Sequence, residues 1–214
     1  MHVEQGRGLA DLGHQVAIAT AVRPHGRWRA EFTGQGNHAG TTLIPDRHDP
    51  VIPVAQTVLA AREAAEREGC VATVGRINVE PGGTNVIASV ATMWLDCRAE
   101  ESQTVTKVVE GIQQTSQAAA DKHGCQVVWT RESWTDRTAF DLCARMLEIL
   151  GTDTPQLSTG AGHDAATLAT TMPTGMLFVR NPTGASHCPA ESASDADCDA
   201  GVEALQAVLE ELVQ

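Results

Sequence analysis

Four histidines stand in surroundings where an imidazole could bind a metal ion or a substrate. They are His2 in HVEQG, His38 in NHAGTT, His163 in GAGHDA and His187 in GASH. A metal site needs neutral imidazoles and carboxylates that converge on one point, and small neighbours let backbone and ligand approach closely. A single histidine is more often an ordinary surface or core residue, so these four matter only if the fold gives them partners.

The segment 86–98 has a strand-like composition, with an amide just before it, Asn85, and a guanidinium at its end, Arg98. Arginine can hold a carboxylate through two parallel hydrogen bonds, and an asparagine amide can add a third. Alternatively, Arg98 is a solvated charge and Asn85 only shapes the turn after Gly82 and Gly83. The sequence leaves both interpretations open.

The segment GAGHDA, residues 160–165, also matches the pattern G-x-G-x-x-A of dinucleotide-binding folds. That pattern needs a strand before it, a helix after it and an acidic residue about 20 positions later. The preceding TPQLST is a poor strand candidate, and no acidic residue ends a following strand at that distance. Nucleotide binding is therefore a weak alternative.

The composition excludes several classes of partner. The chain has 15 Lys and Arg against 27 Asp and Glu, a net charge of -12, and no tyrosine. This charge has the wrong sign for nucleic acid or anionic lipid, and aromatic rings for base stacking are scarce. Six scattered cysteines without a C-x-x-C pair favour reduced thiols. With no signal pattern and no apolar run near the ~20 residues of a membrane span, we expect a cytoplasmic protein without nucleic-acid or membrane partners.

Two periodic patterns open the central part of the chain. Residues 27–33 alternate between apolar and charged side chains, with Trp28 and Phe32 on one face, which is typical of a half-buried strand. After a turn, apolar residues at helical spacing, Leu59 among them, continue to Gly69. This pattern predicts a helix of about four to five turns.

Four further elements follow in the sequence. Two β-branched segments, 71–79 and 86–98, flank the turn EPGGTN and predict a hairpin. A second helical pattern begins at Val105 and ends at Gly124, and an alternating strand begins at Cys125. The order β-α-β-β-α-β is the split βαβ, or ferredoxin-like, arrangement of an α/β domain.

The order of these elements also predicts how the domains are arranged. Residues 26–134 form the complete ferredoxin-like unit, whereas the flanking segments 1–25 and 135–214 supply only two or three credible strands. Such a sheet is thin beside the usual five or so strands. We expect the flanking segments to form one incomplete α/β domain, into which 26–134 is inserted.

Six motifs, in order and with suitable spacing, carry a family resemblance across the chain. They are HVEQGRGL (2–9), GQGNHAGTT (34–42), PGGTNVI (81–87), LDCR (95–98), STGAGHDA (158–165) and GASHCPAE (184–191). With them the chain resembles the zinc-dependent N-carbamoyl-L-amino-acid hydrolases and allantoate amidohydrolases of the aminoacylase-type metallopeptidase clan. The resemblance implies a metallohydrolase catalytic domain with two metal ions and an inserted lid domain that helps to form a homodimer.

The resemblance implies a role for each matching residue. His2 matches a ligand to one zinc ion and His187 matches a ligand to the other. His38 matches a lid histidine that reaches the partner subunit's active site and polarises the scissile carbonyl, from a flexible turn moved by lid closure. Asn85 and Arg98 match lid residues that bind the substrate carboxylate.

The resemblance also implies a substrate pocket and a reaction. Gln5 matches a position that lines the pocket, and residues 160–164 match a loop at its border. The implied reaction is metal-dependent hydrolysis of a non-peptide C–N bond in a small ureido or N-carbamoyl acid such as allantoate. The implied metal is zinc, with manganese as an alternative.

One departure limits what the chain could do alone. The family's other metal ligands (a histidine, an aspartate and a glutamate) and its general base (a second glutamate) lie before the HVEQG motif, whereas this sequence begins at Met1. Because a catalytic zinc takes about three protein ligands, two histidines do not hold two ions. We expect weak zinc binding and no turnover by the chain alone. The alternative function is a non-catalytic remnant that dimerises through the lid.

Overall fold

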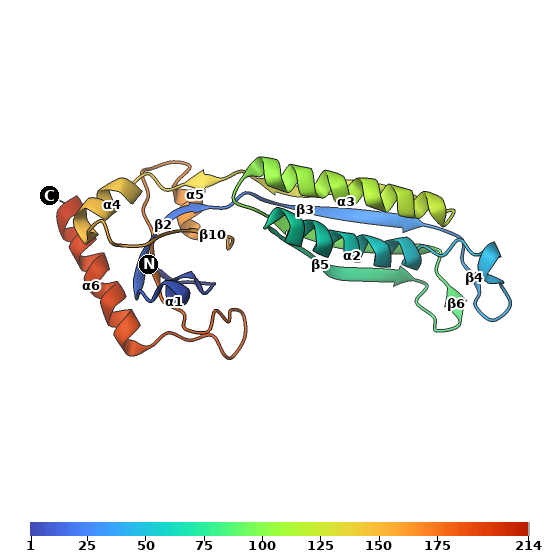
Figure 1. Cartoon of the computed structure of the whole chain (residues 1–214), viewed down its shortest axis with the longest axis horizontal. Helices are drawn as coiled ribbons and strands as arrows, with labels where there is room; N and C mark the ends of the chain where they lie inside the picture. Colours follow the sequence, from blue (N-terminus) through green and yellow to red (C-terminus); the bar gives the residue numbers. More distant parts are fainter. Residues whose placement is uncertain (214) are drawn as a thin grey trace. The chain divides into compact units, whose positions relative to one another are not determined.

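The computed structural model describes residues 1–213 and divides them into two compact units (Figure 1). Residues 24–136 form the inserted unit. Residues 1–23, together with the chain from residue 137 onward, form the flanking unit. Each unit has its own sheet and its own buried core.

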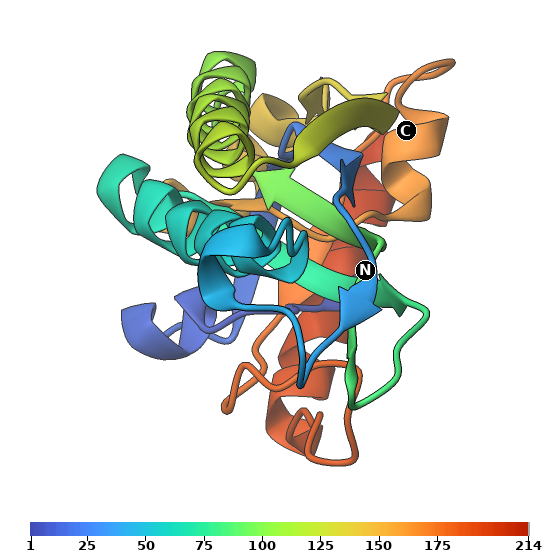
Figure 2. The same cartoon turned by 90° about the vertical axis from the view of Figure 1, so that its right-hand side faces the viewer.

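The inserted unit has the β-α-β-β-α-β order that the sequence predicts. Its main elements are β3 (His25–Thr33), α2 (Val51–Glu68), β5 (Val71–Glu80), β7 (Val90–Arg98), α3 (Ser102–Lys122) and β8 (Gln126–Thr135). The four strands form an antiparallel sheet in the order β5-β7-β3-β8. Figure 2 shows α2 and α3 side by side on one face of this sheet. This is the strand order of the ferredoxin-like arrangement.

The period of each sequence pattern determines which side chains enter this core. Trp28 and Phe32 of β3 are buried as expected, because alternate residues of a strand share a face. Leu59 belongs to the apolar spacing that predicts α2, but it is 64% exposed. Thr57 is buried instead, and its hydroxyl donates to the Pro53 carbonyl at 2.7 Å, which satisfies the polar group inside the helix.

A second, smaller sheet lies beyond the main one. It consists of β4 (Asn37–His38) and β6 (Val86–Ile87), and a short 3-10 helix, η1 (Ile44–Asp46), follows β4. The sequence predicted one continuous strand over 86–98, but the strand is interrupted between β6 and β7. The interruption lets residues after Asn85 pair with the HAGTT region instead of with β5.

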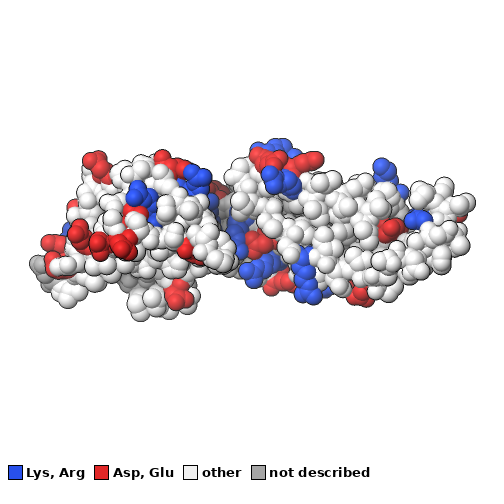
Figure 3. Space-filling model, turned by 90° about the horizontal axis from the view of Figure 1, so that it is seen from below, with Lys and Arg blue, Asp and Glu red and all other residues white. Residues whose placement is uncertain are grey.

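The helix-free side of the main sheet carries ion pairs. The side chains of Arg27 and Asp96 approach to 3.3 Å, and Arg29 approaches Glu31 at 3.1 Å and Glu132 at 3.6 Å. Figure 3 shows acidic and basic side chains interspersed on one face of this unit. Exposed pairs of this kind contribute little to stability, about 0–1 kcal/mol each.

The flanking unit has more strands than the sequence analysis recognised. Its elements are β1 (His2–Val3), α1 (Gly8–Leu12), β2 (Val16–Val22), β9 (Thr138–Ala139), α4 (Cys143–Leu150), β10 (Gln156–Thr159), α5 (Asp164–Leu168), β11 (Leu177–Val179) and α6 (Asp195–Leu212). The sheet has five strands in the order β1-β11-β2-β10, with β9 paired to β2. The expectation of two or three strands was therefore wrong. The apolar strand within GMLFV was predicted and is β11, whereas the missed strands β1, β9 and β10 are two to four residues long, too short to show a periodic pattern.

Helices cover both faces of this sheet. Ile18 of β2 packs with residues of α4 and α6, whereas Ala17 and Ala19 face the layer that contains α1 and α5. The alternation along β2 thus produces a three-layer arrangement. All six cysteines are free thiols. Within residues 1–213, no helix is both long and apolar enough to cross a membrane.

Candidate functional site

Two of the candidate histidines meet in the flanking unit. His2 lies on β1, opposite Phe178 of β11, and the ring of His163, at the start of α5, lies edge-on to it with 4.7 Å between ring centroids. His2 Nδ1 lies 2.6 Å from the Val3 carbonyl, which can only accept, so Nδ1 carries the proton. The lone pair of His2 is then on Nε2, the arrangement that metal-binding histidines usually show.

The pKa of His163 lies below that of an ordinary histidine. Burial and the neighbouring His2 lower its pKa, and the carboxylate of Asp164 opposes this shift. Its Nε2 is buried and has no hydrogen-bond partner among the described residues. The sequence singled out His163 as a candidate but did not predict its contact with His2, because β1 was too short to recognise.

The loop after β11 presents His187 on the surface. His187 adopts a positive φ of 57°, and its backbone N–H donates to Glu191 Oε2 at 2.8 Å. Asn181, which is fully buried, organises this loop by accepting from Gly184 N at 3.0 Å and donating to the Ala185 carbonyl at 2.8 Å. Asn181 was not among the residues predicted from the sequence. The Asn-Pro-Thr-Gly stretch, typical of asparagine-capped turns, was the available signal.

The described residues do not complete a metal centre. Within residues 1–213, no group of three or more His, Cys, Asp or Glu is arranged to hold a metal ion. A pair of catalytic zinc ions needs about three protein ligands for each ion. His2 and His187 have suitable chemistry for ligands, but they do not by themselves fit a two-metal site.

A pocket of about 280 Å³ lies beside this region, within the flanking unit. Gln5 lines it together with Gly160, from the loop expected at the border of a substrate pocket, and Arg23. The carboxylate of Glu4 accepts the backbone N–H groups of Gly8 at 2.8 Å and Leu9 at 2.9 Å. Glu4 therefore closes the first turn of α1 and fixes the chain next to Gln5. The sequence analysis did not identify this role.

His38 and Asn85 come together in the small sheet of the inserted unit. His38 on β4 pairs with Val86, and the Ala39 N–H donates to the Asn85 carbonyl at 3.0 Å. Both His38 and Asn85 are exposed. His38 Nδ1 accepts from the Gly40 N–H at 3.0 Å, so the neutral ring carries its proton on Nε2. The exposed edge of His38 can therefore donate a hydrogen bond.

The turn that carries His38 is braced by side chains. Thr42 Oγ1 donates to the His38 carbonyl at 2.8 Å, and Arg47 Nη2 donates to the Ala39 carbonyl at 2.6 Å. Arg47 Nε also donates to the Thr42 carbonyl at 3.1 Å. These bonds hold the backbone of the turn and leave the His38 ring at the surface.

Arg98 lies far from Asn85 within the inserted unit. Arg98 ends β7 and pairs with His25, whereas β6 joins the other end of β7, near Val90. Eight steps along an extended strand span roughly 27 Å. The expected fork of Asn85 and Arg98 around one carboxylate therefore does not form within a single chain, because the full length of β7 separates the two residues.

Arg98 already holds a carboxylate of its own strand. Its Nε and Nη2 donate to Asp96 at 2.6 and 2.9 Å. Burial acts to raise the pKa of Asp96, but the hydrogen bonds and charges of Arg98 and Arg27 outweigh it, so this pKa lies below its usual value. These hydrogen bonds, which Arg98 donates to Asp96, also raise the pKa of Arg98. Arg98 would have to exchange this partner to bind a substrate carboxylate.

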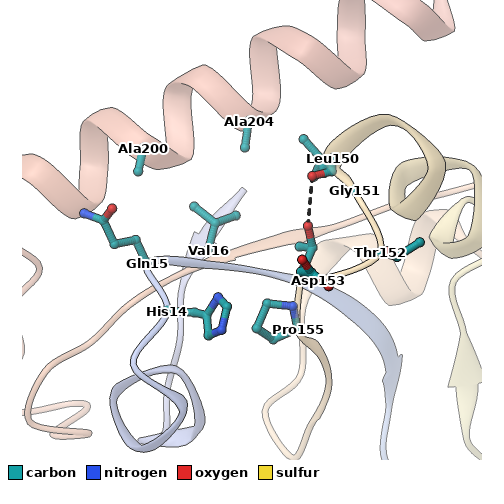
Figure 4. Close-up of a pocket in the computed structure, with 11 residues that line it drawn as sticks. His14, Gln15, Val16, Leu150, Gly151, Thr152, Asp153, Pro155, Ala200 and Ala204 are labelled. Carbon is teal, nitrogen blue, oxygen red and sulfur yellow. Dashed lines mark hydrogen bonds between the residues drawn. The ribbon is translucent and has the colours of Figure 1, made fainter.

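A second hollow, of about 520 Å³, lies between α6 and the start of β2 (Figure 4). Its apolar wall includes Val16, Ala200 and Ala204, and its rim includes His14 and Asp153. The hydrogen bond drawn in Figure 4 runs from Thr154 Oγ1 to the Leu150 carbonyl, at 3.2 Å. No sequence motif pointed to this hollow, and it contains none of the candidate site residues.

The structure also bears on the dinucleotide alternative. The segment before GAGHDA is a strand, β10, and not the poor candidate that the sequence suggested. However, β10 runs parallel to β2, whereas β11, the strand after α5, runs antiparallel to β2. A dinucleotide site needs a parallel β-α-β unit at this point, so the topology argues against nucleotide binding.

Comparison with known proteins places the chain in a family. The description of the family model that matches residues 1–211 is peptidase family M20/M25/M40. The chain is 34% identical over 225 residues to an N-carbamoyl-L-amino acid amidohydrolase of Geobacillus stearothermophilus, covering 100% of this chain and 54% of that protein. It is 28% identical to the allantoate amidohydrolase of Escherichia coli K12, covering 99% of this chain and 53% of that protein.

Solved structures agree with this relationship. The fold matches the crystal structure of AtUAH in complex with (S)-hydroxyglycine with a TM-score of 0.88 and 28% identity, over 98% of this chain and 52% of that one. The same protein is also known in complex with glyoxylate. The chain therefore spans about half the length of the relatives it matches, and it has the mixed α/β fold of that half. This chain belongs to peptidase family M20/M25/M40, and its homologues include N-carbamoyl-L-amino acid and allantoate amidohydrolases.

Proposed function

We propose that this chain forms part of a metal-dependent amidohydrolase that cleaves a non-peptide C–N bond of a ureido or N-carbamoyl acid. The observation that carries the proposal is the match, over 98% of the chain, to a structure that holds (S)-hydroxyglycine, a small acid. In this reaction water and a ureido group give an amine, ammonia and carbon dioxide. In the proposal, the flanking unit is part of the catalytic domain and the inserted unit is the lid.

The proposed roles follow the geometry of each residue. His2 and His187 would each bind one metal ion, zinc or manganese, and their exposed imidazoles and the protonation of His2 Nδ1 support this role. A bound metal would activate the attacking water. Gln5 would line the substrate pocket, and its place in the 280 Å³ pocket supports that role.

His38 would stabilise the oxygen of the scissile carbonyl as negative charge develops on it. The hydrogen bond from Gly40 to His38 Nδ1 supports this role, because it leaves Nε2–H as a fixed donor. Asn85, on the neighbouring strand, would donate to the substrate carboxylate. Arg98 would bind the carboxylate too, after exchanging Asp96 for it.

The separation of these residues favours a homodimer. Because roughly 27 Å of extended strand lies between Arg98 and the β4–β6 sheet, one chain does not bring Arg98 and His38 to the same substrate. A second copy could supply His38 and Asn85 to the site in which Arg98 lies. The proposal therefore assigns His38 and Asn85 to the partner's site.

The β5 edge of the inserted unit is the proposed dimer surface. β5 is an edge strand, and α2 is the helix that packs over it. Four large apolar side chains on these two elements are exposed: Ile52 42%, Leu59 64%, Val71 58% and Ile77 49%. The opposite edge strand, β8, carries one such residue, Val128. An open edge with apolar neighbours is a favourable surface for strand addition between copies.

The test is release of ammonia from allantoate and from N-carbamoyl amino acids. The chain would be assayed alone and together with the half of the Geobacillus relative that it does not match. We expect no turnover alone and turnover by the mixture. His2→Ala, His187→Ala and His38→Ala should each remove most of the activity, whereas His14→Ala, an exposed histidine at the other hollow, should not. Turnover unaffected by His38→Ala would contradict the proposed role of His38.

The second candidate function is a non-catalytic protein that dimerises through the inserted unit. The same exposed residues on α2 and β5 favour it, and it needs no metal. Sedimentation velocity, combined with the ammonia assay, distinguishes this candidate function from the amidohydrolase. A dimer whose mixture with the other half never turns over substrate supports this candidate, and a monomer at every concentration excludes it.

A further inference from the structure

A small hollow opens on the helix-free face of the main sheet of the inserted unit. Its volume is about 180 Å³, and its wall includes Arg27, Thr73, Gly75, Arg76, Trp94 and Asp96. Thr73 pairs with Asp96 and Arg76 pairs with Trp94, so the hollow lies across the neighbouring strands β5 and β7. We call it the β5–β7 hollow.

The β5–β7 hollow is open because β5 has a glycine at its bulge. The register of β5 against β7 shifts between Val74 and Arg76, so Gly75 is the extra residue of a β-bulge. The backbone does not require glycine here, because the φ of Gly75 does not lie in the positive region. Packing does not require it either, since a Cβ atom would meet no atom within 4 Å. Glycine inside a strand weakens the strand and often marks a place where a ligand approaches the backbone.

One end of the hollow presents flat surfaces to an apolar group. Trp94 is half-buried, and its Nε1 donates to Glu132 at 3.3 Å. The Arg76 guanidinium stacks over the indole with its Cζ 4.3 Å from the ring centroid. A guanidinium is planar and weakly hydrated, so it packs well against aromatic groups. A cavity of about 150 Å³ is large enough for benzene, so a hollow of about 180 Å³ suits one aromatic or branched aliphatic side chain.

The other end of the hollow leads to Arg98. Along β7 the hollow runs from Trp94 to Asp96, and Asp96 is the present partner of Arg98. Asp96 and Arg98 are two residues apart on one strand, so they share a face and lie roughly 7 Å apart. In the proposed function Arg98 exchanges Asp96 for the substrate carboxylate. The remainder of that substrate would then lie beside Asp96, where the hollow begins. This surface is charged at Arg98 and apolar at Trp94, which is the pattern of an acid that carries an apolar side chain.

We propose that the β5–β7 hollow is the side-chain subsite of the amidohydrolase and selects N-carbamoyl amino acids with an aromatic or large aliphatic side chain. The substrate carboxylate binds Arg98, and the side chain enters the hollow between Gly75 and Trp94. The inference rests on the proposed function, because it takes Arg98 as the carboxylate-binding residue. The subsite disfavours allantoate, whose ureido groups offer no apolar side chain, and N-carbamoylglycine, which has no side chain.

The first experiment measures binding by the full chain, because the hollow and Arg98 lie in the same unit. Amide and indole N–H resonances of the isotope-labelled chain are followed by NMR during titration with N-carbamoyl-L-phenylalanine and with N-carbamoylglycine. We expect shifts at Gly75 and at the Trp94 indole, and a Kd at least tenfold lower for the phenylalanine derivative. Gly75→Leu fills the hollow and should raise that Kd at least tenfold. Arg98→Ala should raise the Kd of both derivatives.

The matched control is Gly111→Leu. Gly111 lies on α3, which packs on the other face of the sheet, and a Cβ atom there would also meet nothing within 4 Å. This variant should keep both Kd values. Gly75 is exposed, so Gly75→Leu should keep the circular dichroism of the wild-type chain.

The second experiment measures ammonia release by the chain mixed with the unmatched half of the Geobacillus relative. For each derivative kcat/KM is determined, and the ratio of the phenylalanine value to the glycine value gives the preference. We expect Gly75→Leu to lower this preference at least tenfold, mainly through KM, and Gly111→Leu to keep it.

Three results overturn the proposal: the wild-type chain binds both derivatives equally or not at all, Gly75→Leu binds the phenylalanine derivative as the wild type does, or Arg98→Ala leaves that binding intact. Binding that depends on Gly75 and Arg98, without ammonia release by the mixture, contradicts the proposed function and leaves the subsite standing. Ammonia release with the same preference in Gly75→Leu contradicts the subsite and leaves the proposed function standing.

Discussion

The inserted unit and the flanking unit differ in the length of their strands and in the continuity of their cores. The inserted unit has four main strands of nine or ten residues and two long helices on one face, with its apolar residues in continuous clusters. The flanking unit has strands of two to seven residues, an open edge at β1, and the exposed apolar side chains of Val202 and Leu209 on α6. The first has a continuous core, although its β5 edge and the apolar side chains beside it are also uncovered. The second contains most of the candidate site residues, and its sheet has an open edge at β1.

The candidate site residues and the largest buried cores lie in different parts of the chain. His2, Gln5, His163 and His187 all lie at strand ends or in loops of the flanking unit. Residues for binding and catalysis commonly sit in such places, which contribute few core contacts. The inserted unit displays His38, the proposed hydrogen-bond donor, on a braced turn outside its main sheet.

The largest expected effect comes from removing a core aromatic ring in each unit separately. Phe32 is fully buried in the inserted unit and Phe178 is 1% exposed in the flanking unit. Truncation of a buried Phe to Ala typically costs about 3–5 kcal/mol. We expect Phe32→Ala to speed hydrogen exchange in β3, β7 and α3, and Phe178→Ala to speed it in β2 and β11 only. Equal loss of protection in both units for either variant would remove the distinction between them. Leu59→Ala, at an exposed site, is the control.

The second prediction sharpens the view of the flanking unit. Asp197 is buried, and its Oδ2 accepts from Ser194 Oγ at 2.6 Å and from Arg180 Nε at 3.3 Å, while its Oδ1 lies 2.8 Å from Arg180 Nη2 in an ion pair. These contacts join the start of α6 to the end of β11, and removing them leaves Arg180 and Ser194 without this acceptor. We expect Asp197→Ala to lower the free energy of unfolding of this unit by about 2–3 kcal/mol in urea titrations. Asp199→Ala, on the exposed face, should change it little.

The smallest predicted effect concerns the inserted unit in acid. The pKa of Asp96 is lower in the folded state than in the unfolded state, where it is about 3.9. The unfolded state therefore takes up the proton first, and the stabilisation is present above about pH 4 and is lost as the pH falls through the folded-state pKa. We expect Asp96→Asn to remove up to about 1 kcal/mol of this acid dependence. Urea titrations between pH 3 and pH 7 measure it, and an unchanged slope in the variant would contradict the assignment.

The inserted unit could be predicted from the sequence almost element by element. Its strands and helices are long enough for a period of two or 3.6 to appear, as in Trp28 and Phe32. The errors were local. Leu59 fits the apolar spacing of α2 but is exposed, whereas Thr57 is buried with its hydroxyl donating to the Pro53 carbonyl. The break between β6 and β7 depends on pairing with β4, a contact that no single segment shows.

The flanking unit was harder to predict because tertiary pairing creates its strands. β1 and β9 have two residues each, and only their neighbours in the sheet make them strands. For the same reason the contact between His2 and His163 could not be predicted from spacing. The motifs did identify the family, while the distance between Asn85 and Arg98 required the register of β7.

The most direct test of this account is the amount of metal that the chain retains. Zinc per chain after equilibrium dialysis would be measured by elemental analysis for the chain alone and for its complex with the unmatched half of the Geobacillus relative. We predict less than one tightly held ion per chain alone and two in the complex, with His2→Ala and His187→Ala each reducing the latter, since each catalytic zinc needs about three protein ligands. Retention of two zinc ions by the chain alone would contradict the claim that its site is completed from outside residues 1–213.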